Sequence, residues 1–568
     1  MFSVAGEYML RFREKYYFTP QKRQIWKLLL LALVYLHLIF LPEIIALPLC
    51  INYRTSTHLY MQNIFLLLSM AGVLLIFHRI VGRIFLVLYG LWGAFNVVNI
   101  FSLIKFHIIL DATMLQILAI TDKNEVREFS QTYIHWYDFF PFILIIFFIV
   151  ILWKYLLNPT PFGKRVGIML CIPFCLLSLF HLCTGQLKWF GKRNALCRFI
   201  STGLVQYNDE MKKIHSELLR PELPDDIHFI PPESMEKTNN LSEQSILGVV
   251  VVGESARRHN FQCYGYSRNT TPNLLSFPKD SIFFFDDVIS PATSTMRCCI
   301  YDFSMSSIGH FASPQYSICD LLKSAGYFVA LYSNQRRSGA HESLGLLFHN
   351  ADVKSYLMED GHGDRYDMEL LSCLEKMFLD EQVNKPTIIF LHTMGSHHNA
   401  KKRYPAEYTF FQNDLRDENN EGFDDVCAEY VNYYDNSIRY TDEFLGKVIS
   451  LLQKQNRPVF MLYLSDHAEI LAKEKSDTDF RNAQNPFSYE IPFIIYANEA
   501  YKNTWPTFFR EWANSIHKPM QADATIFMVA SLARITYKNF PDDMNILSPR
   551  FNPKPRYMKE TTKAIYSH

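Results

Sequence analysis

The sequence predicts an α-helical membrane domain of five spans followed by an α/β domain. Apolar stretches of about 20 residues fill the first third of the chain, and strand-like and helix-like segments alternate in the rest. The 568 residues carry 56 basic and 56 acidic side chains, and this balance argues against a nucleic-acid partner. We expect a transmembrane domain at 1–186, a linker at 187–244 and a soluble domain at 245–568.

Five apolar stretches are long enough to cross a bilayer, which takes about 20 residues. They lie at 25–50, 61–79, 84–104, 137–157 and 165–185. Basic residues precede the first stretch and occupy the turns after the second and the fourth, which places these segments in the cytoplasm. Five crossings then put the soluble domain outside, in the periplasm of a Gram-negative cell. The alternative is that two of the stretches are buried core helices.

The segment 105–136 between the third and fourth spans lies outside in this topology. Thr121 and Glu125 are four residues apart, so on a helix they share one face and could reach a lipid headgroup. From the spacing alone, an ordinary surface helix is the favoured interpretation.

The linker has two parts. Residues 201–219 have the pattern of an amphipathic helix lying along the membrane. Residues 220–243 combine several prolines with many charges, which favours an extended tether.

One stretch organises the soluble domain. Residues 249–252 are four consecutive valines, typical of a central parallel strand that is buried on both faces. The run stops at Gly253 and presents Glu254 at its C-terminal tip. In open α/β sheets this tip is where ligands bind. The sequence therefore predicts a site around Glu254.

Other predicted strands end in polar groups at the same edge. The strand at 281–288 leads to Thr295 at a helix start, the strand at 387–391 runs into His392, and the strand at 459–464 ends in Ser465, Asp466 and His467. Glu254, Asp466 and His467 form a set of oxygen and nitrogen ligands that suits zinc. Taken singly, Ser465-Asp466-His467 is more typical of a loop with a hydrogen-bonded histidine.

Thr295 is the candidate nucleophile. A metal ion would lower the pKa of its hydroxyl and make an alkoxide, and the start of a helix favours anions. Such a nucleophile suits a phosphorus or sulfur centre, because the cation and the helix end would stabilise the charge on its oxygens. The run Thr293-Ser294-Thr295 alone is more typical of a helix N-cap.

Several motifs in the same order resemble those of the phosphoethanolamine transferases, a family of the alkaline phosphatase/sulfatase superfamily that includes lipid A-modifying enzymes. The matching motifs lie at 253–257, 264–272, 293–295, 392–397, 434–438 and 465–467. The resemblance covers nearly the whole chain. It implies an α-helical membrane domain of five spans plus a sulfatase-like (alkaline phosphatase-type) α/β catalytic domain, in the bacterial inner membrane with the catalytic domain in the periplasm.

The resemblance implies a role for each matching residue. Glu254, Thr295, Asp466 and His467 look like the zinc ligands. Thr295 would take phosphoethanolamine from phosphatidylethanolamine as a covalent phosphothreonine and release diacylglycerol. His397 resembles a histidine that assists at the phosphoryl group. The acceptor would be a lipopolysaccharide, at a core sugar or lipid A, or another envelope glycan.

Four further residues are expected to contact the substrate. Thr121 and Glu125 resemble the family's periplasmic positions near the headgroup, and His392 follows the predicted strand at 387–391. The fourth is Asn334.

The sequence also departs from the family pattern. Pro291-Ala292 replaces a Cys-Gly pair, Ile117 replaces an asparagine, Ala468 replaces a glycine, and a family histidine has no match between 469 and 489. These differences favour the branch that modifies core sugars or other acceptors.

Three alternatives stay open. A membrane-bound glycerophosphate transferase would differ in the donor headgroup. A phosphodiesterase or sulfatase would use water as the acceptor. Sulfatases convert a Cys or Ser in a Cys/Ser-x-Pro-x-Arg context to formylglycine, and residues 295–298 lack both that residue in this context and the proline. An inactive membrane sensor or scaffold would not need the complete ligand set.

Overall fold

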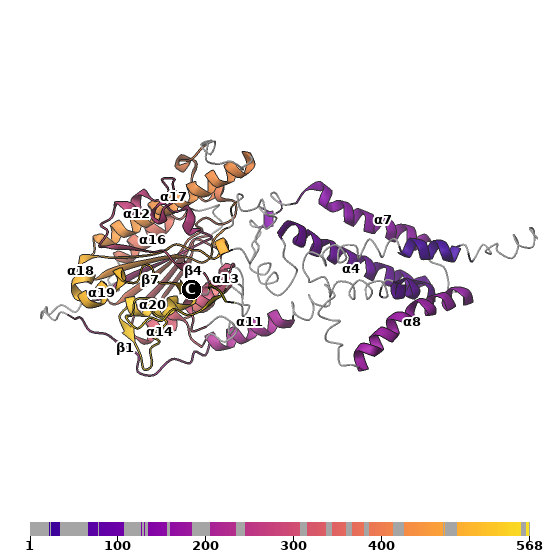
Figure 1. The fold of residues 1–568 in the computed structure, drawn as a ribbon, viewed down its shortest axis with the longest axis horizontal. Helices are drawn as coiled ribbons and strands as arrows, with labels where there is room; N and C mark the ends of the chain where they lie inside the picture. Colours follow the sequence, from indigo (N-terminus) through magenta and orange to yellow (C-terminus); the bar gives the residue numbers. More distant parts are fainter. Residues whose placement is uncertain are drawn as a thin grey trace, which may run out of the picture. The chain divides into compact units, whose positions relative to one another are not determined.

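The computed structural model divides into two compact units, which are coloured along the sequence in Figure 1. Unit 1 comprises Met1–Leu115 and Phe129–Tyr207, and unit 2 comprises Gln116–Glu128 and Asn208–His568. The structure describes residues 24–33, 68–77, 79–106, 134–155, 160–183, 205–233, 245–306, 315–336, 343–358, 366–379, 385–412, 425–469, 486–557 and 564–566, with the single positions 22, 66, 126, 127, 130 and 471.

The described part of unit 1 is almost entirely helical. Its long helices are α4 (Arg79–Phe106), α7 (Phe140–Tyr155) and α8 (Pro161–Cys183). Two stretches in the described residues are long and apolar enough to cross a membrane, Ile80–Asn99 and Trp136–Lys154. The predicted count of five spans is therefore not confirmed. Large parts of the first two predicted spans, including 34–65, lie outside the described residues.

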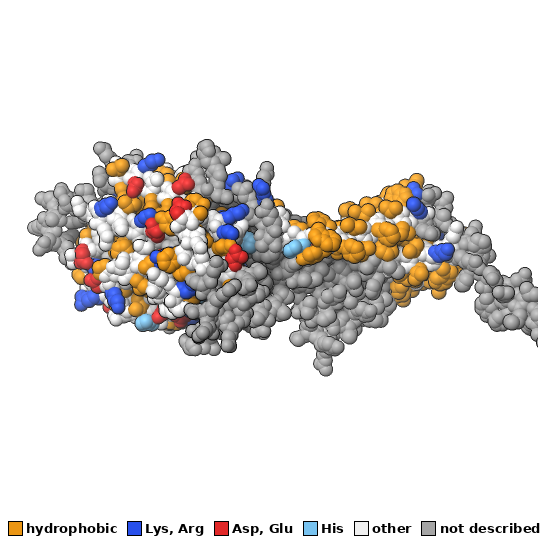
Figure 2. Space-filling view, turned by 90° about the horizontal axis from the view of Figure 1, so that it is seen from above, with side chains coloured by type: hydrophobic (Ala, Val, Ile, Leu, Met, Phe, Trp, Pro, Cys, Tyr) orange, Lys and Arg blue, Asp and Glu red, His pale blue; other side chains and the backbone are white. Residues whose placement is uncertain are grey.

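The helices of unit 1 present apolar side chains outward and gather their basic residues at one end (Figure 2). The guanidinium of Arg83, near the start of α4, lies 4.5 Å from the ring centre of Trp153, near the end of α7. Lys22 lies 5.3 Å from the ring centre of Phe162, in the first turn of α8. These contacts place three basic helix ends on one side of the unit, as the positive-inside rule requires of a cytoplasmic end.

Unit 2 is built on a seven-stranded sheet. The spatial order is β3 (Ile282–Phe285), β9 (Phe493–Ala497), β8 (Val459–Ser465), β2 (Leu247–Gly253), β7 (Thr387–His392), β5 (Phe328–Ser333) and β6 (Val353–Tyr356). The neighbours from β8 to β6 pair in parallel, whereas β9 is antiparallel to β8 and to β3. The sheet is thus mainly parallel, as the expected α/β domain with a central parallel strand requires.

Strand β2 is central, and all seven of its residues are buried. In the ladder, Val252 lies opposite His392 of β7 and Leu464 of β8, and Gly253 lies opposite Ser465. The C-terminal ends of these three strands therefore meet at one edge of the sheet. The residues that follow them, Glu254 and Asp466 among them, become neighbours although 211 positions separate Ser255 from its partner Asp466.

Helices cover both faces of the sheet (Figure 1). One face carries α12 (Pro272–Ser276), α16 (Glu369–Phe378) and α17 (Asp425–Gln453), and the other carries α13 (Thr295–Phe303), α14 (Ile318–Ser324) and α20 (Thr525–Leu532). On the first face, Val249 and Val251 share a core with Ile438 of α17. On the second, the ring of Phe390 packs 5.8 Å from that of Phe303. Burial on both faces explains the run of valines.

Smaller elements complete unit 2. The helices are α15 (Ser343–Leu347), α18 (Glu499–Thr504) and α19 (Pro506–Ala513); β1 (His228–Phe229) pairs with β11 (Ile535–Thr536), β4 (Val288–Ile289) with β10 (Met520–Gln521), and β12 (Arg556–Tyr557) with β13 (Ala564–Tyr566). Helix α11 (Val205–Leu218) occupies part of the predicted linker and buries Met211, Ile214 and Leu218. Its position on a membrane and the domain boundaries at 186 and 244 stay predictions.

Candidate active site

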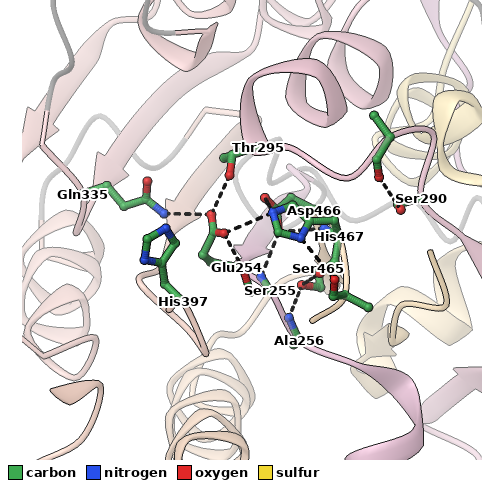
Figure 3. Close-up of polar contacts among 12 residues, drawn as sticks. Glu254, Ser255, Ala256, Ser290, Thr295, Gln335, His397, Ser465, Asp466 and His467 are labelled. Atoms are coloured by element: carbon green, nitrogen blue, oxygen red, sulfur yellow. Dashed lines mark hydrogen bonds and ion pairs between the residues drawn. The ribbon is translucent and has the colours of Figure 1, made fainter. Parts of the chain in front are cut away.

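Glu254 is the residue on which the site converges. It follows the end of β2 and is 1% exposed. Its Oε1 accepts a hydrogen bond from Ser255 Oγ at 2.8 Å. Its Oε2 accepts from Thr295 Oγ1 at 3.0 Å and from Gln335 Nε2 at 3.2 Å (Figure 3). Three donors from different segments therefore aim at one buried carboxylate.

Asp466 and His467 follow β8 on the neighbouring tip. Asp466 is fully buried, and its Oδ1 accepts from Ser255 N at 3.0 Å and from His467 N at 2.7 Å. Its Oδ2 has no hydrogen-bond partner among the described residues. His467 Nε2 lies 3.5 Å from both Glu254 Oε1 and Asp466 Oδ2. Adjacent residues can both face Glu254 because the chain leaves the strand at Ser465.

This cluster fits a divalent metal ion. One ligand atom from each of Glu254, Asp466 and His467 lies within 4.8 Å of the others. A buried oxygen without a partner, such as Asp466 Oδ2, is costly unless something compensates it. Burial, with a further contribution from Asp466, raises the pKa of Glu254 to about 8. A cation between the carboxylates would reverse that shift and satisfy the orphaned oxygen.

Thr295 begins α13 and lies beside this cluster. Ser294 before it is extended, so the helix starts at the candidate nucleophile, and its hydroxyl points to Glu254 (Figure 3). The first N–H groups of a helix have no partner within the helix and favour an anion. The structure thus brings Glu254, Thr295, Asp466 and His467 together as the sequence predicted. Their chemical roles stay predictions.

His397 lies in the loop after β7. Figure 3 shows its ring on the same side of Glu254 as the Gln335 amide. Its main-chain N–H donates to Met394 O at 3.2 Å, so a tight turn presents the ring to the site. Its role at the phosphoryl group stays a prediction.

The other predicted substrate contacts differ in position. Asn334 is fully buried, and its Nδ2 donates to Asp367 Oδ1 at 2.8 Å. His392 is buried at the end of β7, with Nδ1 at 3.0 Å from Ser333 Oγ, and burial lowers its pKa to about 4. Both side chains make contacts within the protein, and their contact with substrate stays a prediction. Thr121 and Glu125 lie outside the described residues, as does Ile117.

The model of the family described as Sulfatase matches residues 247–534. The chain belongs to the sulfatase family. The matched segment contains Glu254, Thr295, Asp466 and His467, so the candidate site lies within the family domain.

Relatives of this sulfatase-family chain carry a shared name. Phosphoethanolamine transferase EptC from Escherichia coli (strain K12) is 26% identical over 374 residues, 64% of this chain and 61% of the relative. Phosphoethanolamine transferase EptA from Helicobacter pylori (strain ATCC 700392 / 26695) is 33% identical over 273 residues, 45% of this chain and 48% of the relative. The matches therefore span less than two thirds of these relatives' lengths.

Solved structures show the same fold. The integral membrane protein lipooligosaccharide phosphoethanolamine transferase A (EptA) from Neisseria meningitidis superimposes with a TM-score of 0.62 at 19% identity, covering 92% of this chain and 97% of that one. The C-terminal periplasmic domain of EcEptC from Escherichia coli, in complex with Zn, gives a TM-score of 0.53 at 24% identity. The match covers 60% of this chain and 93% of that one. The first likeness extends the shared fold beyond the sulfatase domain to nearly the whole chain.

Two donors to Glu254 were missed by the sequence reasoning. Gln335 Nε2 donates to Glu254 and also to Thr393 O at 3.0 Å. It lies two residues beyond β5. Polar residues just after a parallel strand are expected at the edge of the sheet that carries the site, and this expectation applied to β5 would have found it. Ser255 reaches its own neighbour because its φ of 55° turns the chain back after the strand. No sequence pattern marks that turn.

Two of the family-like motifs, at 264–272 and 434–438, supply no candidate metal ligand but hold each other and the turn after Glu254 in place. Tyr434 OH donates to Ser255 O at 2.7 Å and accepts from Arg257 N at 2.8 Å, which holds the turn after Glu254. The neighbouring Asp435 accepts from Tyr266 OH at 2.9 Å and from Arg268 at 2.6 Å. Residues of these two motifs in the sulfatase domain therefore support the site through hydrogen bonds.

We expect Gly395→Ala to disturb the site. Gly395 has a φ of 51°, and a Cβ there would lie 2.7 Å from Glu254 O and 2.9 Å from Glu254 N. The left-handed backbone alone costs about 1–3 kcal/mol for other residues. The clash would in addition displace Glu254, so activity and metal retention should fall beyond the loss of stability.

Gly326→Ala is the matched control, since Gly326 has a φ of 85° and open space around its Cβ position. Thermal unfolding, metal content and turnover would be compared for both variants. Equal metal content and turnover would contradict a special role for Gly395.

Proposed function

We propose that this chain is a membrane-bound phosphoethanolamine transferase. It transfers phosphoethanolamine from phosphatidylethanolamine to a lipopolysaccharide, at a core sugar or lipid A, or to another envelope glycan, through a phosphothreonine at Thr295. One observation carries the proposal: the Thr295 hydroxyl starts a helix and donates to Glu254 at the edge of the Glu254, Asp466 and His467 cluster. The shared name of the relatives supports the group that is transferred.

We infer that the metal is zinc. Glu254, Asp466, His467 and the Thr295 hydroxyl would hold it, and carboxylate, imidazole and hydroxyl donors suit this ion. The Zn complex of the EcEptC domain supports this inference. Zinc would lower the pKa of the threonine hydroxyl and neutralise charge on the phosphoryl oxygens.

The residues of the site divide the reaction between them. Thr295 Oγ1 attacks phosphorus while the bond from phosphorus to the glycerol oxygen breaks. Glu254 accepts the hydrogen bond of the Thr295 hydroxyl in the resting state, orients the attacking oxygen and takes its proton as the bond to phosphorus forms. His397 gives a proton to the departing diacylglycerol oxygen and, in the second step, takes one from the acceptor hydroxyl. Attack by that hydroxyl breaks the bond from phosphorus to Thr295 Oγ1, and Glu254 returns the proton to Thr295.

The membrane part serves to reach the donor lipid. We propose five spans within 1–186, a linker at 187–244 and a periplasmic catalytic domain at 245–568, anchored in the bacterial inner membrane. Trp136 and Tyr137 are exposed in the 3-10 helix Trp136–Phe139 that precedes α7, at the end opposite the Arg83–Trp153 contact. Trp and Tyr are enriched at both membrane–water interfaces, and basic residues are enriched on the cytoplasmic side. Thr121 and Glu125 would contact the lipid headgroup.

The proposal is tested by mass spectrometry of surface glycolipids from cells with and without the gene. We expect one additional phosphoethanolamine on a core sugar, on lipid A or on another glycan, and its absence when Thr295→Ala replaces the wild type. A glycerophosphate group in its place would establish the alternative donor. Identical glycolipids in all three strains would refute the transferase.

A further inference from the structure

Asp367 is a buried carboxylate that joins three segments near the site. It is 3% exposed and lies just before α16. Its Oδ1 accepts from Asn334 Nδ2 at 2.8 Å and from Met394 N at 2.7 Å, and its Oδ2 accepts from Gly395 N at 2.9 Å. Asn334 follows β5, and Met394 and Gly395 follow β7. One side chain therefore ties two strand tips to the start of a helix.

Both tips held by Asp367 reach Glu254. On the β5 side, Gln335 donates from Nε2 to Glu254 Oε2. On the β7 side, Gly395 lies directly against the Glu254 backbone, and Ser396 N donates to Glu254 O at 2.9 Å. Moving either tip would change how the Glu254 carboxylate is held.

The same loop presents His397. Asp367 binds the N–H groups of the two residues before Ser396, and Arg403 binds the carbonyls that follow, with Nε at 3.3 Å from His397 O and an NH2 nitrogen at 2.7 Å from His398 O. The carboxylate of Asp367 therefore binds the start of the turn that carries His397, and the guanidinium of Arg403 binds its end. Neither group touches the Glu254 carboxylate.

We propose that Asp367 is a positioning residue of the transferase, which holds the loop of His397 and the tip of Gln335 in register with Glu254. This inference rests on the proposed function and deepens it. It predicts an effect on the rate of the chemical step, because a displacement of about 1 Å in a catalytic group costs up to about 100-fold.

The chain contains a matched control for this proposal. Asp442, fully buried on α17, accepts from Asn273 N at 2.9 Å, Asn273 Nδ2 at 2.8 Å and Leu274 N at 2.9 Å. Like Asp367, it holds two main-chain N–H groups and one asparagine amide. Its partners lie at the start of α12, away from Glu254. Asp442→Asn therefore removes the same kind of bonds without touching the site.

The test compares Asp367→Asn with Asp442→Asn in the full chain, purified in detergent. The melting temperature, the rate of metal loss to a chelator, and kcat and KM with phosphatidylethanolamine are measured for both. We expect both variants to lose stability, but only Asp367→Asn to lose kcat, by about 100-fold with little change in KM. Its metal should also leave faster. Equal kcat and equal metal retention in the two variants would overturn the proposal.

Coupling to His397 separates positioning from general damage. Asp367→Asn is combined with His397→Ala, and the loss of kcat is compared with the two single losses. If Asp367 acts through His397, the double variant should be little worse than His397→Ala. Fully multiplied losses would overturn action through His397. If Asp367→Asn does not fold, Asn334→Ala removes only one of the three bonds to Asp367 and should lower kcat with little change in KM, whereas loss of a substrate contact would raise KM; Asn273→Ala is its control.

The proposed function and the positioning role of Asp367 are contradicted by different results. A wild-type chain that transfers nothing contradicts the proposed function, whatever the variants do. A wild-type chain that transfers phosphoethanolamine, with Asp367→Asn as active as Asp442→Asn, contradicts the inference alone.

Discussion

Thr295→Ala is expected to abolish transfer while the protein still folds. The Thr295 hydroxyl is the group that donates to Glu254 from the start of α13, and no bond can form to phosphorus without it. Loss of a nucleophile lowers kcat by roughly 10^4-fold or more. Intact-protein mass spectrometry after mixing with phosphatidylethanolamine should show one phosphoethanolamine adduct on the wild type and none on the variant. Thr295→Ser should retain part of the activity, because it keeps the oxygen.

The neighbouring Ser294 supplies the control for this experiment. Ser294 precedes α13, and its side chain makes no capping hydrogen bond to the helix. Ser294→Ala therefore removes an adjacent hydroxyl and should leave adduct formation unchanged. An adduct of normal yield on Thr295→Ala would show that another residue carries the group and would remove the basis of the proposed mechanism.

Asp466→Asn is expected to cost the protein its metal. Oδ1 of Asp466 is occupied by Ser255 N and His467 N, which leaves the buried Oδ2 as the free ligand atom, and an amide there is a poorer ligand or a donor. Loss of an outer-shell partner already costs about 10–100-fold in metal affinity, so loss of this ligand should cost at least about 100-fold. Metal analysis and chelator competition measure the change.

Without metal, the Asp466→Asn variant should have a higher melting temperature than the wild type. Without a cation, Asp466 repels Glu254 and helps to raise the pKa of that carboxyl. Removing one charge relieves the repulsion, so metal-free Asp466→Asn should melt higher than metal-free wild type, and added zinc should raise the melting temperature of the wild type only. A variant that binds zinc as tightly as the wild type would exclude Asp466 as a ligand.

Much of unit 2 was predictable because short stretches of sequence indicate where its buried strands lie and where they end. Four valines in a row fit a strand buried on both faces, and polar residues after such strands meet at one edge whatever lies between them in sequence. That reasoning placed Glu254 beside Asp466 and His467 correctly. The direction of β9 was not predictable, because an apolar strand looks alike in both directions.

The residues that support the site, Asp367 and Tyr434, could not be predicted for a different reason. Asp367 binds main-chain N–H groups of Met394 and Gly395, and every residue other than proline offers such a group, so no pattern points to the pairing. Tyr434 likewise binds the main chain of Ser255 and Arg257. In unit 1 the apolar stretches indicated helices, but length and hydropathy alone did not establish how many of them cross a membrane.

Solvent reaches the three candidate ligands unequally. The side chain of His467 is 15% exposed, whereas those of Glu254 and Asp466 are 1% and 0% exposed. Thr295 is also partly exposed, so a competing chelator reaches the imidazole and the hydroxyl before it reaches the two carboxylates. Dissociation of the ion then depends on access from this one side, so bulky chelators should extract it more slowly than small ones of equal affinity.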